Sequence, residues 1–217
     1  MVLICGIDEA RRGPLIGPMV ITGVLVSEKE EKFLKKLDVK DSKLLSPKQR
    51  KELFPKIKFV IKKYKSIVMK PKEIDKAVLS DDSNLNWLEA DKTCEIINFL
   101  KPDIVYIDCP SNNIKAYLDY VKDQLKNKKI KIIAEHNAER YTPVAAASII
   151  SKVIGDREIE KIKKKLKINF GSGYPSDPLT QKFLSKNYDK YPEIFRKSWA
   201  TYTSIVSKKG QKKLGEF

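Results

Sequence analysis

Four carboxylates of this sequence stand at or just beyond the ends of apolar, strand-like runs. They are Asp8, Glu9, Asp108 and Glu139. Because ligands of α/β sheets gather at strand ends, we expect these side chains to converge. Converging carboxylates repel one another unless a cation lies between them, and a set of oxygen ligands alone suits Mg²⁺ or Mn²⁺. The sequence therefore predicts a site for divalent metal ions at one edge of a sheet.

The chemistry open to such a site is hydrolysis of a phosphodiester. Two hard cations about 3.5–4 Å apart activate a water molecule and stabilise the leaving oxygen. This chemistry needs neither histidine nor cysteine, and the chain has one histidine, His136, and three scattered cysteines without a CxxC pair. The cysteines are typical of reduced, buried thiols rather than of a disulfide framework, a zinc site or a nucleophile.

A basic loop, Arg11–Pro14, follows the first acidic pair. Gly13 permits a tight turn and a close approach of the backbone to a ligand. The loop amides, with Arg12, could cradle a phosphate or a sugar hydroxyl, although a charged surface turn would have the same pattern. Lys43 is a candidate phosphate contact and Tyr174, on a glycine-rich segment, could stack on a nucleotide. The alternatives are an exposed lysine and a half-buried tyrosine.

The charge of the chain agrees with a polyanionic partner. Lysine and arginine number 44 against 28 aspartates and glutamates, which gives a net charge of +16. Such a balance suits nucleic acid, although a lysine-rich protein with another role would show it too. No apolar run is long enough for a membrane helix, and the first strand-like run has no basic flank of the kind that precedes a signal peptide. We therefore expect a cytoplasmic protein without a membrane partner.

The elements that position these residues alternate between strands and helices. Apolar, β-prone runs predict five strands, at Met1–Ile7, Met19–Val26, Phe59–Met69, Ile104–Ile107 and Ile130–Ala134. Helical spacing and N-cap signals predict helices at Glu28–Leu37, from Ser46-Pro47 (a short one), and at Pro71–Leu79, Asn86–Leu100, Ile114–Leu125, Val144–Leu166 and Asp177–Asn187. Ser207–Phe217 predicts a mobile or loosely docked tail. This order favours a mixed α/β sheet with helices on its faces.

Taken together, the motifs of the chain resemble type 2 ribonuclease H (ribonuclease HII), most nearly its archaeal form. The resemblance covers nearly the whole chain, and its specificity comes from the ordered set rather than from any one motif. The matching stretches are Gly6–Ala10, Arg12–Pro14, Gly17–Val20, Val39–Lys43, Tyr106–Asp108, Ala134–His136, Ala146–Ile150, Gly171–Pro178 and Arg196–Trp199.

The resemblance implies a ribonuclease H-like fold, with a mixed five-stranded sheet flanked by helices and a small helical C-terminal extension. It implies a catalytic domain at residues 1–166 and a substrate-binding extension with a basic tail at residues 167–217. It also implies a monomeric endonuclease that depends on Mg²⁺ or Mn²⁺. Such an enzyme cuts the RNA of RNA/DNA hybrids and duplex DNA 5′ of embedded ribonucleotides, leaving a 3′-hydroxyl and a 5′-phosphate.

The resemblance also implies roles for single residues. Asp8, Glu9 and Asp108 match the metal ligands of the family. The other matches concern the substrate: the loop that reads the ribose 2′-hydroxyl, the tyrosine that stacks on the sugar beside the RNA–DNA junction, and a phosphate-contacting lysine. In this chain Arg12 and Gly13 match the loop, Tyr174 matches the stacking tyrosine, and Lys43 matches the lysine.

Two positions depart from the family pattern. Arg11 replaces the first glycine of a Gly-Arg-Gly loop, so a long cation could hinder the substrate or add a phosphate contact. Glu139 stands where the family usually has its fourth carboxylate as an aspartate, and its longer side chain could offset a shift of the backbone. Asp156 is the alternative fourth carboxylate. These departures leave two other readings open: another nuclease of the ribonuclease H fold, such as a resolvase, or a non-catalytic hybrid-binding protein.

Overall fold

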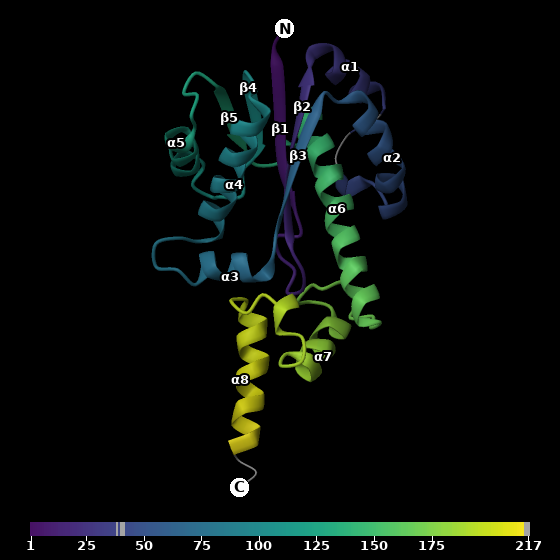
Figure 1. Cartoon of the computed structure of the whole chain (residues 1–217), viewed down its shortest axis with the longest axis vertical. Coiled ribbons are helices and arrows are strands. Elements are labelled where there is room, and N and C mark those ends of the chain that lie inside the picture. Colours follow the sequence, from purple (N-terminus) through teal and green to yellow (C-terminus); the bar gives the residue numbers. More distant parts are fainter. Residues whose placement is uncertain (38, 40–41, 215–217) are drawn as a thin grey trace.

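A computed structural model describes residues 1–37, 39 and 42–214 of the chain (Figure 1), without the side chains of residues 43 and 209–214. The described strands are β1 (Leu3–Ala10), β2 (Met19–Ser27), β3 (Lys63–Met69), β4 (Ile104–Asp108) and β5 (Lys131–Glu135). The described helices are α1 (Glu28–Lys36), α2 (Pro47–Val60), α3 (Pro71–Val78), α4 (Leu85–Leu100), α5 (Ile114–Gln124), α6 (Thr142–Leu166), α7 (Pro178–Asn187) and α8 (Ala200–Leu214). Three short 3₁₀ turns are η1 (Ser42–Leu44), η2 (Ala138–Arg140) and η3 (Pro192–Ile194).

The strands form one mixed sheet in the order β3-β2-β1-β4-β5. β1 and β2 pair antiparallel, as do β2 and β3, whereas β1, β4 and β5 run parallel. This confirms the predicted mixed five-stranded sheet flanked by helices. Because β1, β4 and β5 share one direction, their carboxyl ends meet at the same edge of the sheet.

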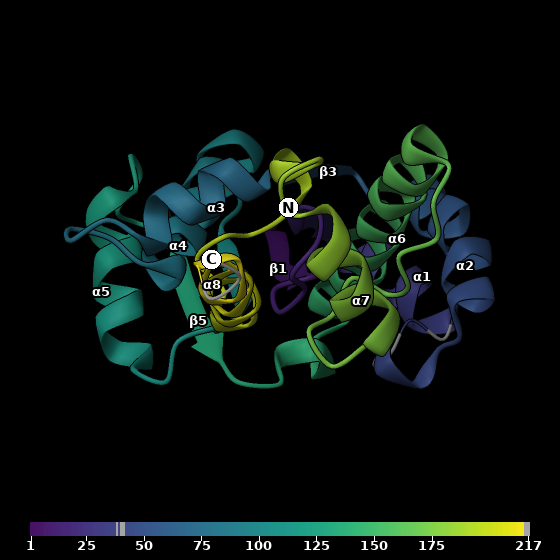
Figure 2. The same cartoon turned by 90° about the horizontal axis from the view of Figure 1, so that it is seen from below.

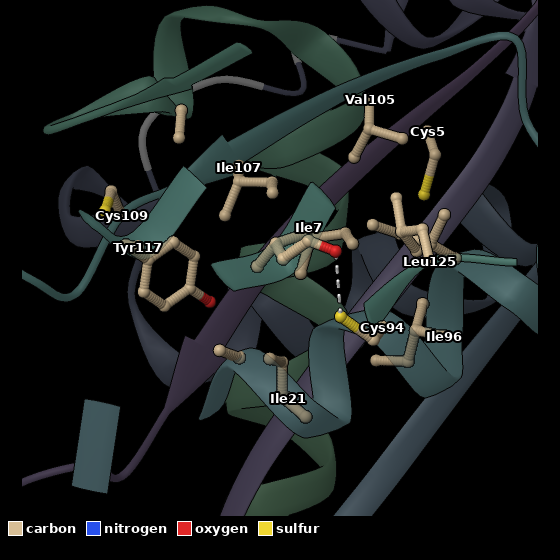
Figure 3. Close-up of a cluster of buried hydrophobic side chains, with 14 of the residues drawn as sticks. Cys5, Ile7, Ile21, Cys94, Ile96, Val105, Ile107, Cys109, Tyr117 and Leu125 are labelled. Carbon is tan, nitrogen blue, oxygen red and sulfur yellow. Dashed lines mark hydrogen bonds between the residues drawn. The ribbon is translucent and has the colours of Figure 1, made fainter. Parts of the chain in front are cut away.

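Helices cover both faces of the sheet, as Figures 1 and 2 show. On one face, Cys5, Ile7 and Val105 of the strands pack against α4 residues such as Cys94 and Ile96 (Figure 3). On the other face, strand residues pack against α1, α2 and α6, in a core that includes Ile4, Val24, Leu34, Ile57 and Ile149. Alternation along β1 therefore directs even-numbered side chains towards α6 and odd-numbered ones towards α4.

Gly6 lets α6 lie directly on β1. A Cβ at this position would lie 2.1 Å from the carbonyl carbon of Pro143 and 2.2 Å from the amide nitrogen of Val144. Both atoms belong to the backbone of the first turn of α6, so they cannot rotate away as a side chain would. The first turn of α6 thus comes as close to the strand as glycine allows.

We expect Gly6→Ala to destabilise the fold by about 3 kcal/mol or more, because overpacking here must displace backbone rather than a side chain. The measurement is the free energy of unfolding in urea. Gly13→Ala is the matched control, since a Cβ at Gly13 has no neighbour closer than 3.8 Å. Equal stability of the two variants would show that α6 shifts freely on β1.

The C-terminal segment, described over residues 167–214, lies below the end of β1 in Figure 1 and packs against the residues that follow this strand. It builds a separate apolar cluster around residues that follow β1 and the last turns of α6. The buried members are Leu15, Ile16, Ile159, Phe170, Phe183, Leu184, Ile194 and Phe195. The predicted division into residues 1–166 and 167–217 stays a prediction.

Some elements differ from the sequence predictions. Ser207–Leu214, predicted as part of a mobile or loosely docked tail, forms the end of the helix α8, which projects away from the sheet in Figure 1. Its lysines, glutamine and leucine favour a helix with little packing, and they outnumber the one poor helix former, Gly210. Phe59 and Val60 end α2 instead of opening a strand, which makes α2 a 14-residue helix rather than a short one. No helix in the described part of the chain is long and apolar enough to cross a membrane.

Candidate active site

The structure brings the four predicted carboxylates to one edge of the sheet. Asp8 and Glu9 lie within β1, near its carboxyl end, rather than beyond it. Asp108 ends β4, and Glu139 lies in η2, just after β5. Their charges act on one another: the carboxylates of Glu9, Asp108 and Glu139 all raise the pKa of Asp8. Parallel strands with a common end explain the convergence.

Burial is the main reason that these groups resist ionisation. Asp8 is 5% exposed, and its burial, followed by the charge of Glu9, raises its pKa well above the ordinary value, while a hydrogen bond from Ser148 lowers it. Burial also raises the pKa of Glu9 to about 8, with a further contribution from Glu89 and a lowering one from Arg12. The metal-free site therefore holds acidic groups that are costly to ionise.

Glu139 is held by the helix that follows it. Its Oε1 accepts hydrogen bonds from the hydroxyls of Ser42, at 2.7 Å, and Ser148, at 2.6 Å. The ammonium group of Lys152 lies 3.6 Å from the same oxygen. The chain reaches this position through a left-handed residue, Asn137, with a φ of 58°. The Glu139 carboxylate is thus positioned by α6 and η1.

Asp156, the alternative fourth carboxylate, lies in α6, two turns beyond Ser148, and contacts other residues than Glu139 does. Its oxygens face the guanidinium groups of Arg11, at 3.7 Å, and Arg50, at 3.8 Å. It does not figure among the charges that shift the pKa of Asp8, whereas Glu139 does. The geometry thus favours Glu139 over Asp156 as the partner of the other three carboxylates.

The donor set fits a hard divalent cation by its chemistry. All four groups offer carboxylate oxygens, and their mutual repulsion is the condition that a bound cation relieves. Within residues 1–37, 39 and 42–214, no group of three or more histidine, cysteine, aspartate or glutamate side chains already has the arrangement of a metal site. The three cysteines are free and buried, and burial raises the pKa of Cys109, which disfavours a thiolate ligand or nucleophile.

Arg11 corrects one expectation from the sequence. Its side chain is 9% exposed and points into the protein, where its Nη2 donates to the carbonyl of Ser172 at 2.9 Å. Neither predicted effect of this side chain, a phosphate contact or a steric hindrance, agrees with that orientation. Gly155 and Gly173 leave space for the Arg11 side chain. A Cβ at Gly155 would lie 2.7 Å from its Cδ, and a Cβ at Gly173 would lie 3.1 Å from its Nη2. Arg11 keeps the left-handed backbone, with a φ of 60°, that the glycine of the family motif would adopt easily.

Arg12 points the other way, towards α4. Its Nε donates to Oε1 of Glu89 at 2.9 Å, and its Nη2 donates to Oδ1 of Asn86 at 2.8 Å. Glu89 is 1% exposed, whereas the side chain of Arg12 is 37% exposed. A buried carboxylate thus fixes the orientation of a partly exposed cation beside Glu9.

Gly13 and Tyr174 face each other across a narrow space. A Cβ on Gly13 would lie 3.8 Å from Cε1 of Tyr174, whose side chain is 41% exposed. The two segments are joined by backbone bonds from Leu15 and Ile16 to the carbonyl of Gly173, at 2.7 and 3.2 Å. Among the residues that the structure describes, the amides of residues 12 and 13 have no hydrogen-bond acceptor. This surface can therefore donate backbone hydrogen bonds to a ligand that stacks on the tyrosine.

Lys43 cannot be placed, because its side chain lies outside the described residues. Sequence reasoning missed three residues that orient the site, namely Glu89, Asn86 and Lys152. The signal for Glu89 was an acid between apolar neighbours of a helix, a position where an unpaired charge would be costly. Ser42 and Ser148 stood out only as parts of motifs. The partners of Glu89, Asn86 and Ser42 are distant in sequence, so the sequence did not specify them.

The stability of the metal-free protein is expected to fall as the pH rises. Burial raises the pKa of Glu89 from 4.5 to about 7 and that of Glu9 from 4.5 to about 8. Both shifts are upward, so their stabilisation is complete below the unfolded value and is lost as the pH rises through the folded values. We expect the thermal midpoint in a chelator to drop by on the order of 5 °C between about pH 5 and 8.

In the variant Glu89→Gln the thermal midpoint should fall less steeply below about pH 7, because the glutamine amide is neutral over the whole pH range. Glu95→Gln, an exposed change on the same helix, is the matched control. If the thermal midpoint of the parent protein did not change between about pH 5 and 8, the raised pKa values of Glu9 and Glu89 would be contradicted.

Comparisons with known proteins agree with this arrangement. The family model described as Ribonuclease HII matches residues 5–202. Ribonuclease HII of Pyrococcus furiosus is 43% identical over 222 residues, which cover 98% of this chain and 96% of the relative. The crystal structure of the ribonuclease H2 from Pyrococcus horikoshii matches with a TM-score of 0.86 and 42% identity, over 95% of this chain and 98% of that chain. Bst ribonuclease HIII, solved in complex with Mn²⁺, matches in fold alone, with a TM-score of 0.82 and 18% identity, over 95% of this chain and 70% of that chain.

Proposed function

The chain belongs to the ribonuclease HII family, which makes it a hydrolytic endonuclease that acts on the RNA strand of RNA/DNA hybrids, and we propose that it also cuts 5′ of ribonucleotides embedded in duplex DNA. The observation that carries this proposal is the pair of available amides at Arg12 and Gly13, beside Tyr174 and next to the carboxylates. Backbone donors can bind the 2′-hydroxyl of any ribonucleotide, because every ribose carries one and no deoxyribose does. A single ribonucleotide offers the same hydroxyl as a full RNA strand.

Asp8, Glu9, Asp108 and Glu139 are the residues proposed to hold divalent cations, Mg²⁺ or Mn²⁺. When bound, a pair of such ions would supply an activated water and stabilisation of the leaving 3′-oxygen, which gives a 3′-hydroxyl and a 5′-phosphate. Mn²⁺ is the ion of the Bst ribonuclease HIII structure, whose fold this chain shares. Ser42, Ser148 and Lys152 keep Glu139 oriented towards the site.

The substrate would lie along the surface between the loop of residues 11–13 and Tyr174. The exposed tyrosine ring can stack on a sugar, and Arg12, oriented by Glu89, can contact the backbone of the nucleic acid. Arg11 contributes through its backbone, since its side chain is engaged inside the protein. The net charge of +16 supports binding to a polyanionic duplex, and Lys43 is proposed as one of the phosphate contacts. Cytoplasmic location and a monomeric state stay predictions.

A cleavage assay on three labelled duplexes tests this function. The duplexes are an RNA/DNA hybrid, a DNA duplex with one ribonucleotide, and an all-DNA four-way junction, each incubated with Mg²⁺, Mn²⁺ or a chelator. We expect metal-dependent cleavage of the first two, with 3′-hydroxyl and 5′-phosphate ends. Cleavage of the junction alone would favour a resolvase, and binding without cleavage would favour a non-catalytic hybrid-binding protein. Products with a 2′,3′-cyclic phosphate would contradict metal-activated water.

The identity of the fourth carboxylate has its own test. Glu139→Gln is expected to lower kcat by roughly a hundredfold, because a metal-binding oxygen loses its charge. Asp156→Asn is expected to keep kcat within about threefold, since its partners are Arg11 and Arg50. The measurement is single-turnover cleavage of the ribonucleotide-containing duplex in Mn²⁺. The reverse ranking would assign the fourth position to Asp156.

A further inference from the structure

The loop of residues 11–13 is held from inside the protein by a buried arginine of the C-terminal segment. The side chain of Arg196 is 0% exposed. Its Nη2 donates to the carbonyl of Arg11 at 2.7 Å, its Nη1 donates to the carbonyl of Arg12 at 2.5 Å, and its Nε donates to the carbonyl of Gly17 at 3.1 Å. One guanidinium thus binds both ends of the turn that follows β1.

A tryptophan completes this arrangement. Nε1 of Trp199 donates to the carbonyl of Gly13 at 3.1 Å, and the Arg196 guanidinium lies 5.0 Å from the centre of the Trp199 ring. The turn between these two residues is anchored to α3, because the amides of Lys197 and Ser198 donate to the carboxylate of Asp75 at 3.0 and 2.9 Å. The donor groups of Arg196 and Trp199 are therefore held in place by the contact of this turn with α3.

The direction of the carbonyls decides the direction of the amides. In a trans peptide, the carbonyl of one residue and the amide of the next point to opposite sides. Arg196 binds the carbonyls of residues 11 and 12, so the amides of Arg12 and Gly13 must point away from it. Neither of these amides has a hydrogen-bond acceptor among the described residues.

We propose that Arg196 and Trp199 are positioning residues that aim the Arg12 and Gly13 amides at the substrate ribose, so that the C-terminal segment sets the preference for ribonucleotides. The proposal rests on the proposed function, because it needs a 2′-hydroxyl to be bound at this loop. Arg196 touches neither metal ligands nor the exposed surface, so it acts only through the loop.

The cost of this arrangement supports a role beyond packing. Burial, with a contribution from the charge of Arg11, lowers the pKa of Arg196 to about 9, although Tyr174, Asp75 and Glu89 raise it. An apolar side chain of the same size would avoid this desolvation. A planar guanidinium holds its donors in fixed directions on three nitrogens, whereas the donors of an ammonium group all radiate from one nitrogen. The buried guanidinium of Arg196 thus fixes the directions in which the carbonyls and amides of residues 11–13 point.

The test measures binding rather than turnover. Each variant is made in an Asp8→Asn background that does not cleave. Its Kd for a DNA duplex with one ribonucleotide is compared with its Kd for the all-DNA duplex of the same sequence. Trp199→Phe keeps the ring beneath Arg196 and removes one donor, so we expect the preference for the ribonucleotide duplex to fall by about threefold to tenfold. Trp87→Phe, the same change at the other tryptophan of the chain, is the matched control and is expected to keep the preference.

Arg196→Lys extends the test, because lysine keeps the charge but lacks the three separate nitrogens that bind the carbonyls of Arg11, Arg12 and Gly17. We expect it to lose about tenfold or more of the preference, with its thermal midpoint recorded alongside. A merely structural role would lower the midpoint and weaken both duplexes equally. An unchanged preference in Trp199→Phe would overturn the inference. A parent protein that shows no preference and cuts no ribonucleotide would instead refute the proposed function.

Discussion

Replacing Asp8 with asparagine is expected to reduce cleavage by roughly a thousandfold or more, while raising the stability of the metal-free protein. The activity is lost because the amide offers a weaker, neutral ligand at the centre of the four carboxylates. The gain in stability has a different origin. Burial and the charge of Glu9 raise the pKa of Asp8, so at neutral pH folding must either bury a charge or take up a proton. Asparagine requires neither.

The expected rise in the thermal midpoint is about 3–5 °C in a chelator at pH 7. Mn²⁺ should raise the midpoint of the parent protein, because the ion binds the folded state, and should raise that of the variant much less. Asp119→Asn, an exposed change on α5, is the control and should alter neither activity nor midpoint. Near-normal turnover of Asp8→Asn would remove this residue from the site.

Gly13→Ala is expected to cost roughly a hundredfold in kcat/KM on a duplex with one ribonucleotide, because a displacement of about 1 Å at a reacting group has an effect of that size. The added methyl group would stand 3.8 Å from Cε1 of Tyr174, in the space where the sugar is proposed to lie. It would meet no other atom within 4 Å, and the backbone of Gly13 is not among the left-handed glycines. The fold should therefore tolerate the change.

The measurements for Gly13→Ala are kcat and KM on this duplex and the free energy of unfolding. Leu179→Ala, an exposed change on α7 beyond the Tyr174 segment, is the matched control. We expect the free energy of unfolding of both variants to lie within about 1 kcal/mol of that of the parent protein, and only Gly13→Ala to lose activity. Full activity of Gly13→Ala would show that the ribose does not approach this glycine.

Arg11 shows where reasoning from sequence failed. The motif predicted a cation on a loop beside the substrate, and its reach suggested a phosphate contact. The structure instead turns the side chain inward to Ser172 and Asp156. Gly155 was the available signal, because a glycine inside a long helix often marks a close approach. The approaching residue could not be named, since a contact between β1 and α6 depends on how the helix lies on the sheet.

The sequence by itself determined the family, the five strands and the convergence of Asp8, Glu9, Asp108 and Glu139, because strand periodicity and strand ends are local properties. The tertiary structure alone decided how these groups are oriented. Ser42 on Glu139, Glu89 on Arg12 and Arg196 on the loop after β1 each join segments that are distant in the chain. Hydrogen bonds of buried polar groups depend on which atoms the packing brings within about 3 Å, and local patterns in the sequence do not encode that distance.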